Sequence, residues 1–186
     1  MRKVIYALSV SLDGFIEAAN GDLSWGFPDE ELHRHFNERE AMIDVQLYGR
    51  RLYEGMVAFW PTADEDPEAP EYVVEYARIW KDKPRVVFST TLDHVESNAR
   101  LVRENISEVV ERLKEQPGEY MSVGGAGLAA SCIERGLIDE YWLYVHPVVL
   151  GEGKPMFPAL RERLTLQLVE TQTFGSGVVL LRYRVS

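Results

Sequence analysis

The sequence predicts an α/β fold in which helices cover a mostly parallel central sheet that ends in an antiparallel hairpin. Short apolar runs rich in β-branched and aromatic residues alternate with segments whose apolar residues recur at helical spacing. This alternation is typical of a parallel sheet covered by helices. Near the end of the chain, two strand-like runs are separated by Gly175-Ser176-Gly177, which predicts an antiparallel hairpin.

The expected elements follow in chain order. A buried strand over residues 4–10 leads into the turn Ser11-Leu12-Asp13-Gly14 and then a loop over 15–25. A helix begins near Pro28, where acidic residues favour a first turn, and Leu32, Phe36 and Ile43 lie near one of its faces. Further strands end at Gly49 and Gly124 and span 85–89, 140–149, 164–171 and 178–185; further helices run from Gly49 through Met56, over 106–113 and over 126–135. The acidic segment 61–70 contains three prolines and is expected to be an exposed loop.

Composition limits the kind of protein that this chain can be. Its 186 residues suit one domain, 1–186, and no apolar run approaches the roughly 20 residues that span a bilayer. The first residues lead directly into a strand pattern without a signal peptide, so we expect the cytoplasm. With 30 acidic and 20 basic residues, the net charge of −10 argues against nucleic acid and anionic membranes as partners. Cys132, the only cysteine, is expected to be a buried, inert thiol.

Two strand-to-helix junctions are the most informative motifs. The first is Gly49-Arg50-Arg51, and the second runs through Val123, Gly124, Gly125, Ala126 and Gly127. In each, a strand ends in glycine and a helix begins, so backbone N–H groups and the positive end of the helix dipole can face a phosphate. Two such sites suggest a ligand with several phosphates, and the planar guanidinium groups of the two arginines suit an additional ribose phosphate. The motifs therefore predict NADPH as the cofactor.

Other interpretations of these junctions remain open. Gly125-Ala126-Gly127-Leu128-Ala129-Ala130 fits the dinucleotide fingerprint of a Rossmann fold, but a Rossmann domain places this motif after its first strand. The glycines are also compatible with close packing of helix on sheet alone. Ser89 and Thr90 follow another strand, where their hydroxyls either bind a phosphate or cap the next turn.

Two carboxylates are candidates for acid chemistry. Asp13 follows the first strand, at the edge where open α/β sheets bind ligands, and Glu30 follows the aromatic segment that begins at Trp25. Apolar surroundings raise the pKa of a carboxyl group and make it a usable proton donor. The alternative is an Asp-Gly turn and ordinary acidic residues in a first helical turn. The four histidines, His33, His35, His94 and His146, show no metal-binding spacing, so we expect no metal.

The ordered set of motifs resembles the dihydrofolate-reductase-like superfamily. The motifs that carry the resemblance are residues 7–14, Gly49-Arg50-Arg51-Leu52-Tyr53, Val87-Phe88-Ser89, Val123-Gly124-Gly125-Ala126, Asp139-Glu140 and 147–153. The closer similarity is to the reductase domain of the bifunctional riboflavin-biosynthesis deaminase/reductase, and it covers nearly the whole chain. The resemblance implies a three-layer α/β/α fold. The chain shows no deaminase domain and no zinc-ligand set, and segments 15–31 and 57–70 match neither enzyme closely enough to name a substrate.

The resemblance also implies a function and roles for individual residues. It implies hydride transfer from NADPH to a small heterocycle, as in 5-amino-6-(5-phosphoribosylamino)uracil reductase or dihydrofolate reductase. Gly49, Arg50, Arg51, Tyr53, Ser89 and Thr90 would lie near the adenosine and its phosphate, Val123 to Gly127 at the pyrophosphate, and Ala7 and Ile16 beside the nicotinamide. Glu30 is the first candidate for proton transfer and Asp13 the second, with both of them and Trp25 near the substrate. Homodimers are common in this branch, and the strand that contains Tyr141-Trp142-Leu143-Tyr144 is a candidate interface. A non-catalytic NADPH-binding protein and a flavin- or antifolate-binding protein remain alternatives.

Overall fold

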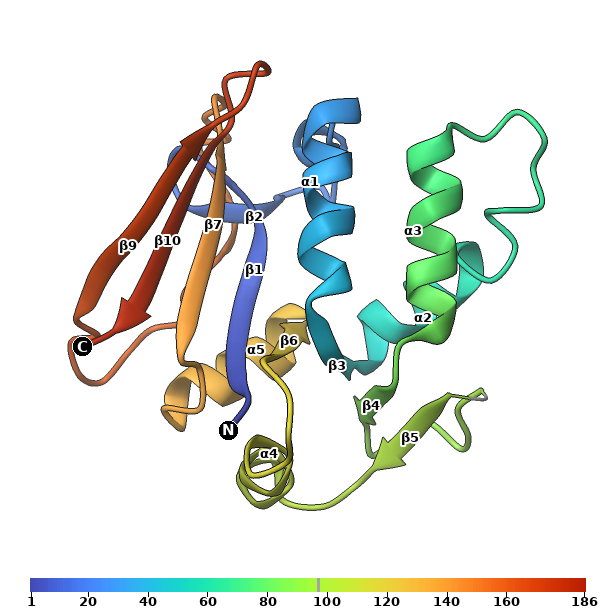
Figure 1. The fold of residues 1–186 in the computed structure, drawn as a ribbon. Helices are drawn as coiled ribbons and strands as arrows, with labels where there is room; N and C mark the ends of the chain where they lie inside the picture. Colours follow the sequence, from blue (N-terminus) through green and yellow to red (C-terminus); the bar gives the residue numbers. More distant parts are fainter. Residues whose placement is uncertain (97) are drawn as a thin grey trace.

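The central feature of the structure is an eight-stranded sheet in which the first strand lies inside (Figure 1). A computed structural model describes residues 1–96 and 98–186. The sheet consists of β1 (Lys3–Ser11), β3 (Ile43–Gly49), β4 (Arg85–Phe88), β5 (Ala99–Val102), β6 (Tyr120–Gly124), β7 (Glu140–His146), β9 (Leu166–Thr173) and β10 (Val179–Val185), in the order β5-β4-β3-β6-β1-β7-β10-β9. All neighbours from β5 to β7 are parallel, whereas β10 is antiparallel to both β7 and β9. This arrangement confirms the predicted mostly parallel sheet with a terminal hairpin.

Helices cover both faces of the sheet. They are α1 (Glu30–Ala41), α2 (Arg50–Phe59), α3 (Glu71–Asp82), α4 (Ile106–Lys114) and α5 (Ala126–Glu134), and a short 3₁₀ helix η1 spans Ser24–Gly26. Because successive side chains of a strand point to opposite faces, β1 contributes to two hydrophobic clusters. Val4 and Tyr6 pack in the cluster that contains the buried residues of α4 and α5, and Ile5 packs in the cluster that contains Leu32 of α1. The three layers of the predicted α/β/α architecture are therefore present.

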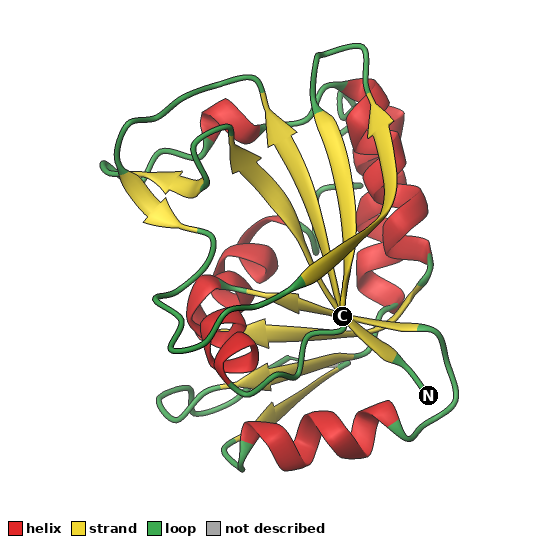
Figure 2. Cartoon of the chain, turned by 90° about the vertical axis from the view of Figure 1, so that its left-hand side faces the viewer, coloured by secondary structure: helices red, strands yellow, loops and turns green. Residues whose placement is uncertain are grey.

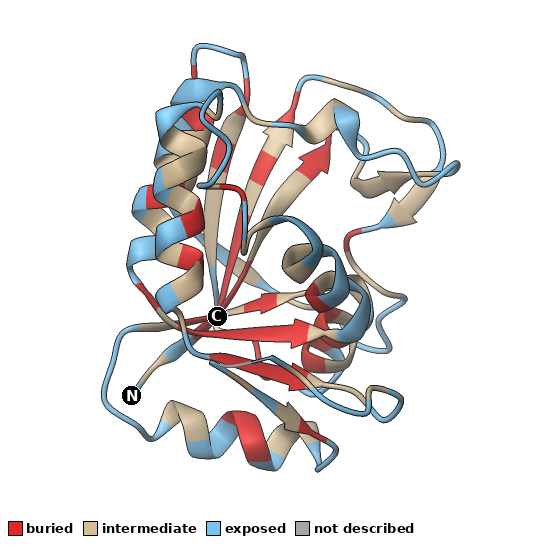
Figure 3. Cartoon of the chain, turned by 90° about the vertical axis from the view of Figure 1, so that its right-hand side faces the viewer, coloured by how far each residue is buried: buried red, intermediate tan, exposed pale blue. Residues whose placement is uncertain are grey.

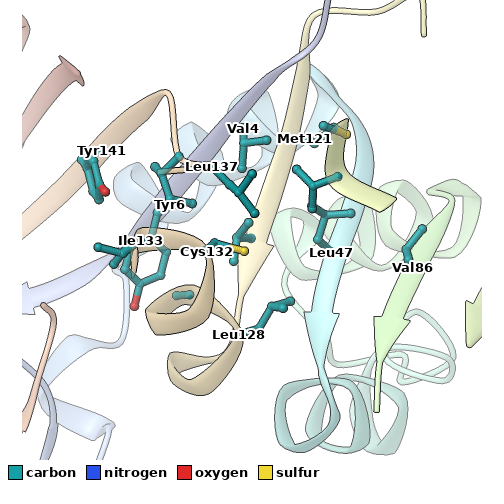
Figure 4. Close-up of a cluster of buried hydrophobic side chains, with 14 of the residues drawn as sticks. Val4, Tyr6, Leu47, Val86, Met121, Leu128, Cys132, Ile133, Leu137 and Tyr141 are labelled. Carbon is teal, nitrogen blue, oxygen red and sulfur yellow. The ribbon is translucent and has the colours of Figure 1, made fainter. Parts of the chain in front are cut away.

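The α5 side of the sheet shows how closely helix and strands pack. Leu128, Cys132 and Ile133 of α5 face Val4 and Tyr6 across the cluster (Figure 4). The Cys132 side chain has no exposed surface, and burial raises its pKa to about 11, so the thiol is packed as predicted. In Figure 3 the buried residues lie along the strands and on parts of the helices, while exposed residues lie on the helices and in the loops.

Several elements differ from the expectations. Ile43 begins β3 and is not part of α1, which ends at Ala41 with Met42 as its C-cap. Position 43 lies eleven residues after Leu32, which is three helical turns, so periodicity alone could not separate the two states. The expected loop 15–25 contains η1 and the strand β2 (Phe15–Ala18), which pairs with β8 (Gly153–Pro155) in a separate small sheet (Figure 2). Helix α3 and strand β5 were not predicted, and β7 ends at His146, before Pro147 and three residues earlier than expected.

Two surface assignments also need correction. The strand proposed as a dimer interface, β7, lies between β1 and β10, and Tyr141, Trp142 and Tyr144 are all buried in the sheet. Its apolar residues therefore form core and not an accessible surface. In the segment 61–70, which is a loop as predicted, Ala63 is buried, so the loop is not exposed throughout.

A buried carboxylate connects three strands of the sheet. Glu140, at the start of β7, is 3% exposed and accepts hydrogen bonds from Lys3 Nζ at 2.8 Å, Trp142 Nε1 at 2.9 Å and Arg182 Nε at 2.9 Å. Desolvation acts to raise the pKa of this carboxyl group, but the hydrogen bonds from Arg182, Lys3 and Trp142 outweigh it and lower the pKa below 4.5. Glu140 therefore joins β1, β7 and β10 as a charged, fully bonded group.

Replacing Glu140 with glutamine is expected to lower the free energy of unfolding by about 1.5–3 kcal/mol at pH 7, because this buried group loses its charged hydrogen bonds to the partly buried Arg182 and the exposed Lys3. A carboxyl group whose folded pKa is lowered stabilises the fold above its unfolded pKa and loses that contribution as the pH falls through the folded value. The difference in the free energy of unfolding between wild type and E140Q should thus be constant from pH 7 to 5 and shrink below pH 4.5. Urea unfolding at several pH values measures it.

Glu170 provides a matched control for this prediction. It binds the same Arg182 at 3.3 Å but is half exposed, so E170Q should change stability by less than about 1 kcal/mol. Equal effects of the two substitutions would show that Glu140 does not hold the strands together.

Candidate functional site: the carboxyl edge of the parallel strands

The two glycine junctions lie side by side at the carboxyl edge of the sheet. Gly49 ends β3 and Gly124 ends β6, and these strands are neighbours in which Tyr48 pairs with Gly124. A Cβ atom on Gly124 would overlap Leu52 Cδ2, and one on Gly125 would lie 3.5 Å from the backbone nitrogen of Gly49. Gly125 also has φ = +95°, a conformation that other residues rarely adopt. Glycine is thus required at position 125 by its backbone conformation, and a side chain at position 124 would displace Leu52.

The helices that begin at these junctions have uncapped amino ends. Asp29 caps α1 and Asn105 caps α4 through side-chain hydrogen bonds, whereas the N-caps of α2 and α5 are Gly49 and Gly125, which have no side chain to bond. The first N–H groups of a helix have no partner within it, so these two ends are suited to an anion. A Cβ atom on Gly127 would meet nothing within 4 Å, so the space beside the start of α5 is open.

The predicted adenosine-side residues occupy different environments. Arg50 and Arg51 are exposed at the start of α2, where Arg50 pairs with Glu54 at 3.4 Å. Tyr53 is buried, and its hydroxyl accepts a hydrogen bond from the backbone N–H of Glu96 at 2.8 Å. The structure therefore leaves the two arginines available at the surface, while Tyr53 anchors a neighbouring loop.

Ser89 and Thr90 follow β4, as expected. The hydroxyl oxygen of Ser89 accepts hydrogen bonds from the backbone N–H groups of Thr91 at 3.1 Å and Leu92 at 3.0 Å. This is the turn-capping arrangement that the sequence left open, and Thr90 beside it is exposed. Of the two residues predicted to flank the nicotinamide, Ala7 packs in the cluster of α1 and Ile16 in the cluster of α4 and α5, so they lie in different hydrophobic clusters.

Asp13 holds two loops together. Its carboxylate accepts hydrogen bonds from Ser11 Oγ at 2.7 Å and from the backbone N–H groups of Leu150 at 3.1 Å and Gly151 at 2.8 Å. The hydrogen bond from Ser11 is the main reason that the pKa of Asp13 is lowered. This direction is the opposite of the raised pKa expected for a proton donor. The geometry instead fixes the turn after β1 to the segment that leads into β8.

Glu30 is the first residue of α1. Its carboxylate binds Arg34 Nε at 3.0 Å, one helical turn further on, and both side chains are largely exposed. The preceding residue, Asp29, accepts a hydrogen bond from the backbone N–H of Leu32 at 2.9 Å. Glu30 is therefore accessible at the beginning of a capped helix, close to the segment that carries Trp25.

Trp25 lies beside a residue that sequence reasoning did not select, His146. Their rings meet edge to face at a centroid distance of 5.7 Å, and His146 Nε2 lies 3.0 Å from Ser9 Oγ. His146 is buried, and burial lowers its pKa below 6.5. Both residues line a cavity of about 240 Å³ between the start of α1, the end of β7 and the tip of the β9–β10 hairpin. One feature of the sequence could have identified His146 as a candidate site residue: it ends a buried strand directly before Pro147.

Other features of the surface lie away from this edge or do not form a site. A larger cavity, about 730 Å³, lies between the carboxyl end of α5 and residues 159–164. Within 1–96 and 98–186, no three histidine, cysteine, aspartate or glutamate side chains are grouped so that they could bind a metal. In the same ranges, no helix has the length and apolar character needed to cross a bilayer.

The glycine junctions generate a stability prediction. Gly125→Ala should lower the free energy of unfolding by about 1–3 kcal/mol, because alanine is strained at φ = +95°. Gly127→Ala should leave it unchanged or raise it by up to about 1 kcal/mol, because this glycine lies in a helix with open space around it. Thermal unfolding of the two variants measures the contrast; equal destabilisation would contradict the packing described for Gly125.

Comparison with known proteins places this geometry in context. The family model described as the RibD C-terminal domain matches residues 2–180. The uncharacterized protein YyaP of Bacillus subtilis (strain 168) is 39% identical over 186 residues, which cover 98% of this chain and 94% of YyaP. A putative riboflavin biosynthesis protein from Shewanella sp. PV-4 has a similar structure, with a TM-score of 0.77, 20% identity and coverage of 100% and 99% of the two chains. Dihydrofolate reductase from Enterococcus faecalis, complexed with NADP(H) and RAB-propyl, aligns with a TM-score of 0.65, 15% identity and coverage of 99% and 96%. The fold is therefore dihydrofolate-reductase-like.

Proposed function

The chain belongs to the family of RibD C-terminal domains, and we propose that it is an NADPH-dependent reductase that transfers hydride to a small heterocyclic substrate. One observation carries the proposal: two helices with glycine N-caps begin side by side at the carboxyl edge of the sheet, where α/β folds bind their ligands. The Enterococcus faecalis enzyme, which binds NADP(H), shares this fold and supports the same choice of cofactor.

The chain's own residues suit the phosphates of this cofactor. The open space beside Gly127 and the uncapped start of α5 would accommodate the pyrophosphate, which needs close approach to backbone N–H groups. Arg50 and Arg51, exposed at the start of α2, would bind the ribose phosphate that distinguishes NADPH from NADH. The bound cofactor supplies the hydride, and the protein aligns the donor with the acceptor.

Glu30 is the preferred proton donor to the substrate in this proposal. Asp13 is already bonded to three donors, which favour its charged form. Glu30 has one exposed ion pair, with Arg34, and lies beside the segment of Trp25 and Phe27. We therefore propose that Glu30 delivers the proton, directly or through water, and that Asp13 shapes the substrate side by holding the loop at Gly151.

NADPH should bind at least tenfold more tightly than NADH, and replacing Arg50 and Arg51 together with alanine should remove most of this preference. The reason is the loss of charge-assisted hydrogen bonds to the ribose phosphate. The affinity for each cofactor is measured in a separate titration that is monitored by energy transfer from the tryptophans to the nicotinamide. Arg112→Ala is the control. It removes an exposed arginine on α4 that pairs with Glu104, and it should leave the preference for NADPH intact. Equal affinity of the wild type for NADPH and NADH would overturn the proposed cofactor.

The two carboxylates should respond differently to removal of their charge. On any imine or carbonyl that a substrate panel shows to be reduced, Glu30→Gln should lower kcat by 10²-fold or more with little change in thermal stability. Asp13→Asn should lower the melting temperature because it weakens the attachment of Gly151. A non-catalytic nucleotide-binding protein would be favoured if the chain binds NADPH but reduces no imine or carbonyl of the panel, and if neither substitution has an effect.

A further inference from the structure

A cavity of about 190 Å³ lies between α2, the carboxyl end of α3 and the start of β4. The residues that line it include Tyr53, Val57, Trp80, Lys81 and Arg85. Its volume is below the range of about 300–1,000 Å³ that is usual for drug-sized ligands. The cavity therefore suits a compact group and not a dinucleotide.

This cavity is separate from the two glycine junctions. Arg85, the first residue of β4, pairs with Gln46, whereas Phe88, the last residue of β4, pairs with Gly49. Arg85 and Gly49 thus lie at opposite ends of the paired strands, about 10 Å apart along them. A ligand of this cavity would accordingly lie away from the edge at which the proposed cofactor binds.

The side chain of Arg85 lies on the face of the sheet that carries the cavity. Successive side chains of a strand point to opposite faces, and Val86 packs in the cluster of α4 and α5. Val87 returns to the other face, where it packs with Tyr53 of α2. The Arg85 guanidinium lies over the ring of Trp80, 3.8 Å from its centroid. Strand alternation and this stacking both place the guanidinium on the side of α2 and α3.

The guanidinium of Arg85 has no counter-charge in contact with it. The residue is 5% exposed, and its side chain makes one hydrogen bond within 1–96 and 98–186, from Nη1 to the carbonyl oxygen of Trp80. Nε is enclosed and has no partner in these ranges. Burial lowers the pKa of Arg85, because nearby groups offset only part of the lost hydration. A buried cation without a paired anion is unfavourable, so an anion in the cavity stabilises it.

Two other charged side chains line the cavity. Lys81 Nζ pairs with Asp64 Oδ1 at 2.5 Å, and its remaining hydrogens are available to a second acceptor. Glu96 is exposed, and its charge acts on Arg85 without forming an ion pair in the part of the chain that the structure describes. This carboxylate opposes an anion in the cavity, but solvent screens it. Arg85 is therefore the buried charge that a ligand here would neutralise.

We infer that this cavity is a binding site for a small oxyanion of the size of phosphate, held by the guanidinium of Arg85 with Lys81 as a second donor. A planar guanidinium presents paired N–H groups that match two oxygens of such an anion, and the ring of Trp80 holds that plane in place. The bound anion connects α2, α3 and β4 and so stabilises the folded chain. The site is independent of the proposed reductase activity.

Nitrogen-15 NMR of the full chain, titrated with inorganic phosphate at pH 7, tests the inference. The Nε–H resonance of Arg85 and the indole N–H resonance of Trp80 should shift together and saturate. The expected dissociation constant is on the order of 1 mM, as for two charge-assisted hydrogen bonds. Chloride at the same ionic strength should shift neither resonance. Absence of saturation, or an equal response to chloride, would overturn the inference.

Variants of charged residues distinguish this site from others on the molecule. Replacing Arg50 and Arg51 together with alanine should leave both phosphate-dependent shifts intact, because these arginines lie at the glycine junction. Glu96→Gln should tighten phosphate binding about twofold to threefold, since it removes a like charge from the rim. Loss of the shifts in the Arg50/Arg51 variant would assign phosphate to the junction and reject the cavity.

Thermal unfolding links the bound anion to Arg85. Phosphate should raise the melting temperature of the wild type more than chloride does at equal ionic strength. Arg85→Gln should abolish this difference, whereas Arg100→Gln, which changes an exposed arginine on the neighbouring strand β5, should preserve it. If Arg85→Gln does not fold, Lys81→Gln should weaken phosphate binding about threefold to tenfold. Unchanged phosphate affinity in Lys81→Gln, or a persistent difference in Arg85→Gln, would contradict the assigned site.

Discussion

The close contact between the two strand-to-helix junctions is the constraint on which the rest of the structure depends. Gly124 and Gly125 bring the start of α5 against the start of α2, and a side chain at Gly124 would displace Leu52 of α2. As a result, two positive helix ends lie on adjacent strands, β3 and β6, at one edge of the sheet. A bulky residue at either glycine would push the starts of the two helices apart. The N-caps of the two helices, Gly49 and Gly125, are both glycines, so neither helix has a side-chain cap at this edge of the sheet.

The sequence predicted those parts of the fold whose signals are local. Glycine directly after a β-rich run identified both junctions, and the spacing of Ile106, Val109, Val110 and Leu113 identified α4. Helix α3 carried a comparable signal, since Ala77 and Trp80 are its buried residues, but it follows a segment broken by prolines and was not predicted. Strand β5 has only four residues, one of them the exposed Arg100, and it pairs with β4 at the edge of the sheet. Such a strand is defined by its neighbour more than by its own residues.

The substrate side of the candidate site was harder to predict because its contacts join distant parts of the chain. Asp13 binds Gly151, and Ser9 binds His146, each across more than 130 residues. Reasoning on the sequence assigned a role to Asp13 from its place after β1, but its partners, which decide its protonation, lie far along the chain. His146 was considered only as a metal ligand. Its relation to Trp25 depends on β1 and β7 being neighbours, which the local pattern does not specify.

The position of β1 inside the sheet also affects how the chain is made. Its two partners, β6 and β7, begin at Tyr120 and Glu140, so this strand of buried residues has no neighbour until well over half of the chain exists. At a synthesis rate of roughly 5–20 residues per second, that interval is on the order of 10 s. During this time the apolar residues from Val4 to Val10 are available to other chains and to chaperones. The strand that organises the finished sheet is thus separated from its first partner by more of the chain than β3 or β4 is from its own.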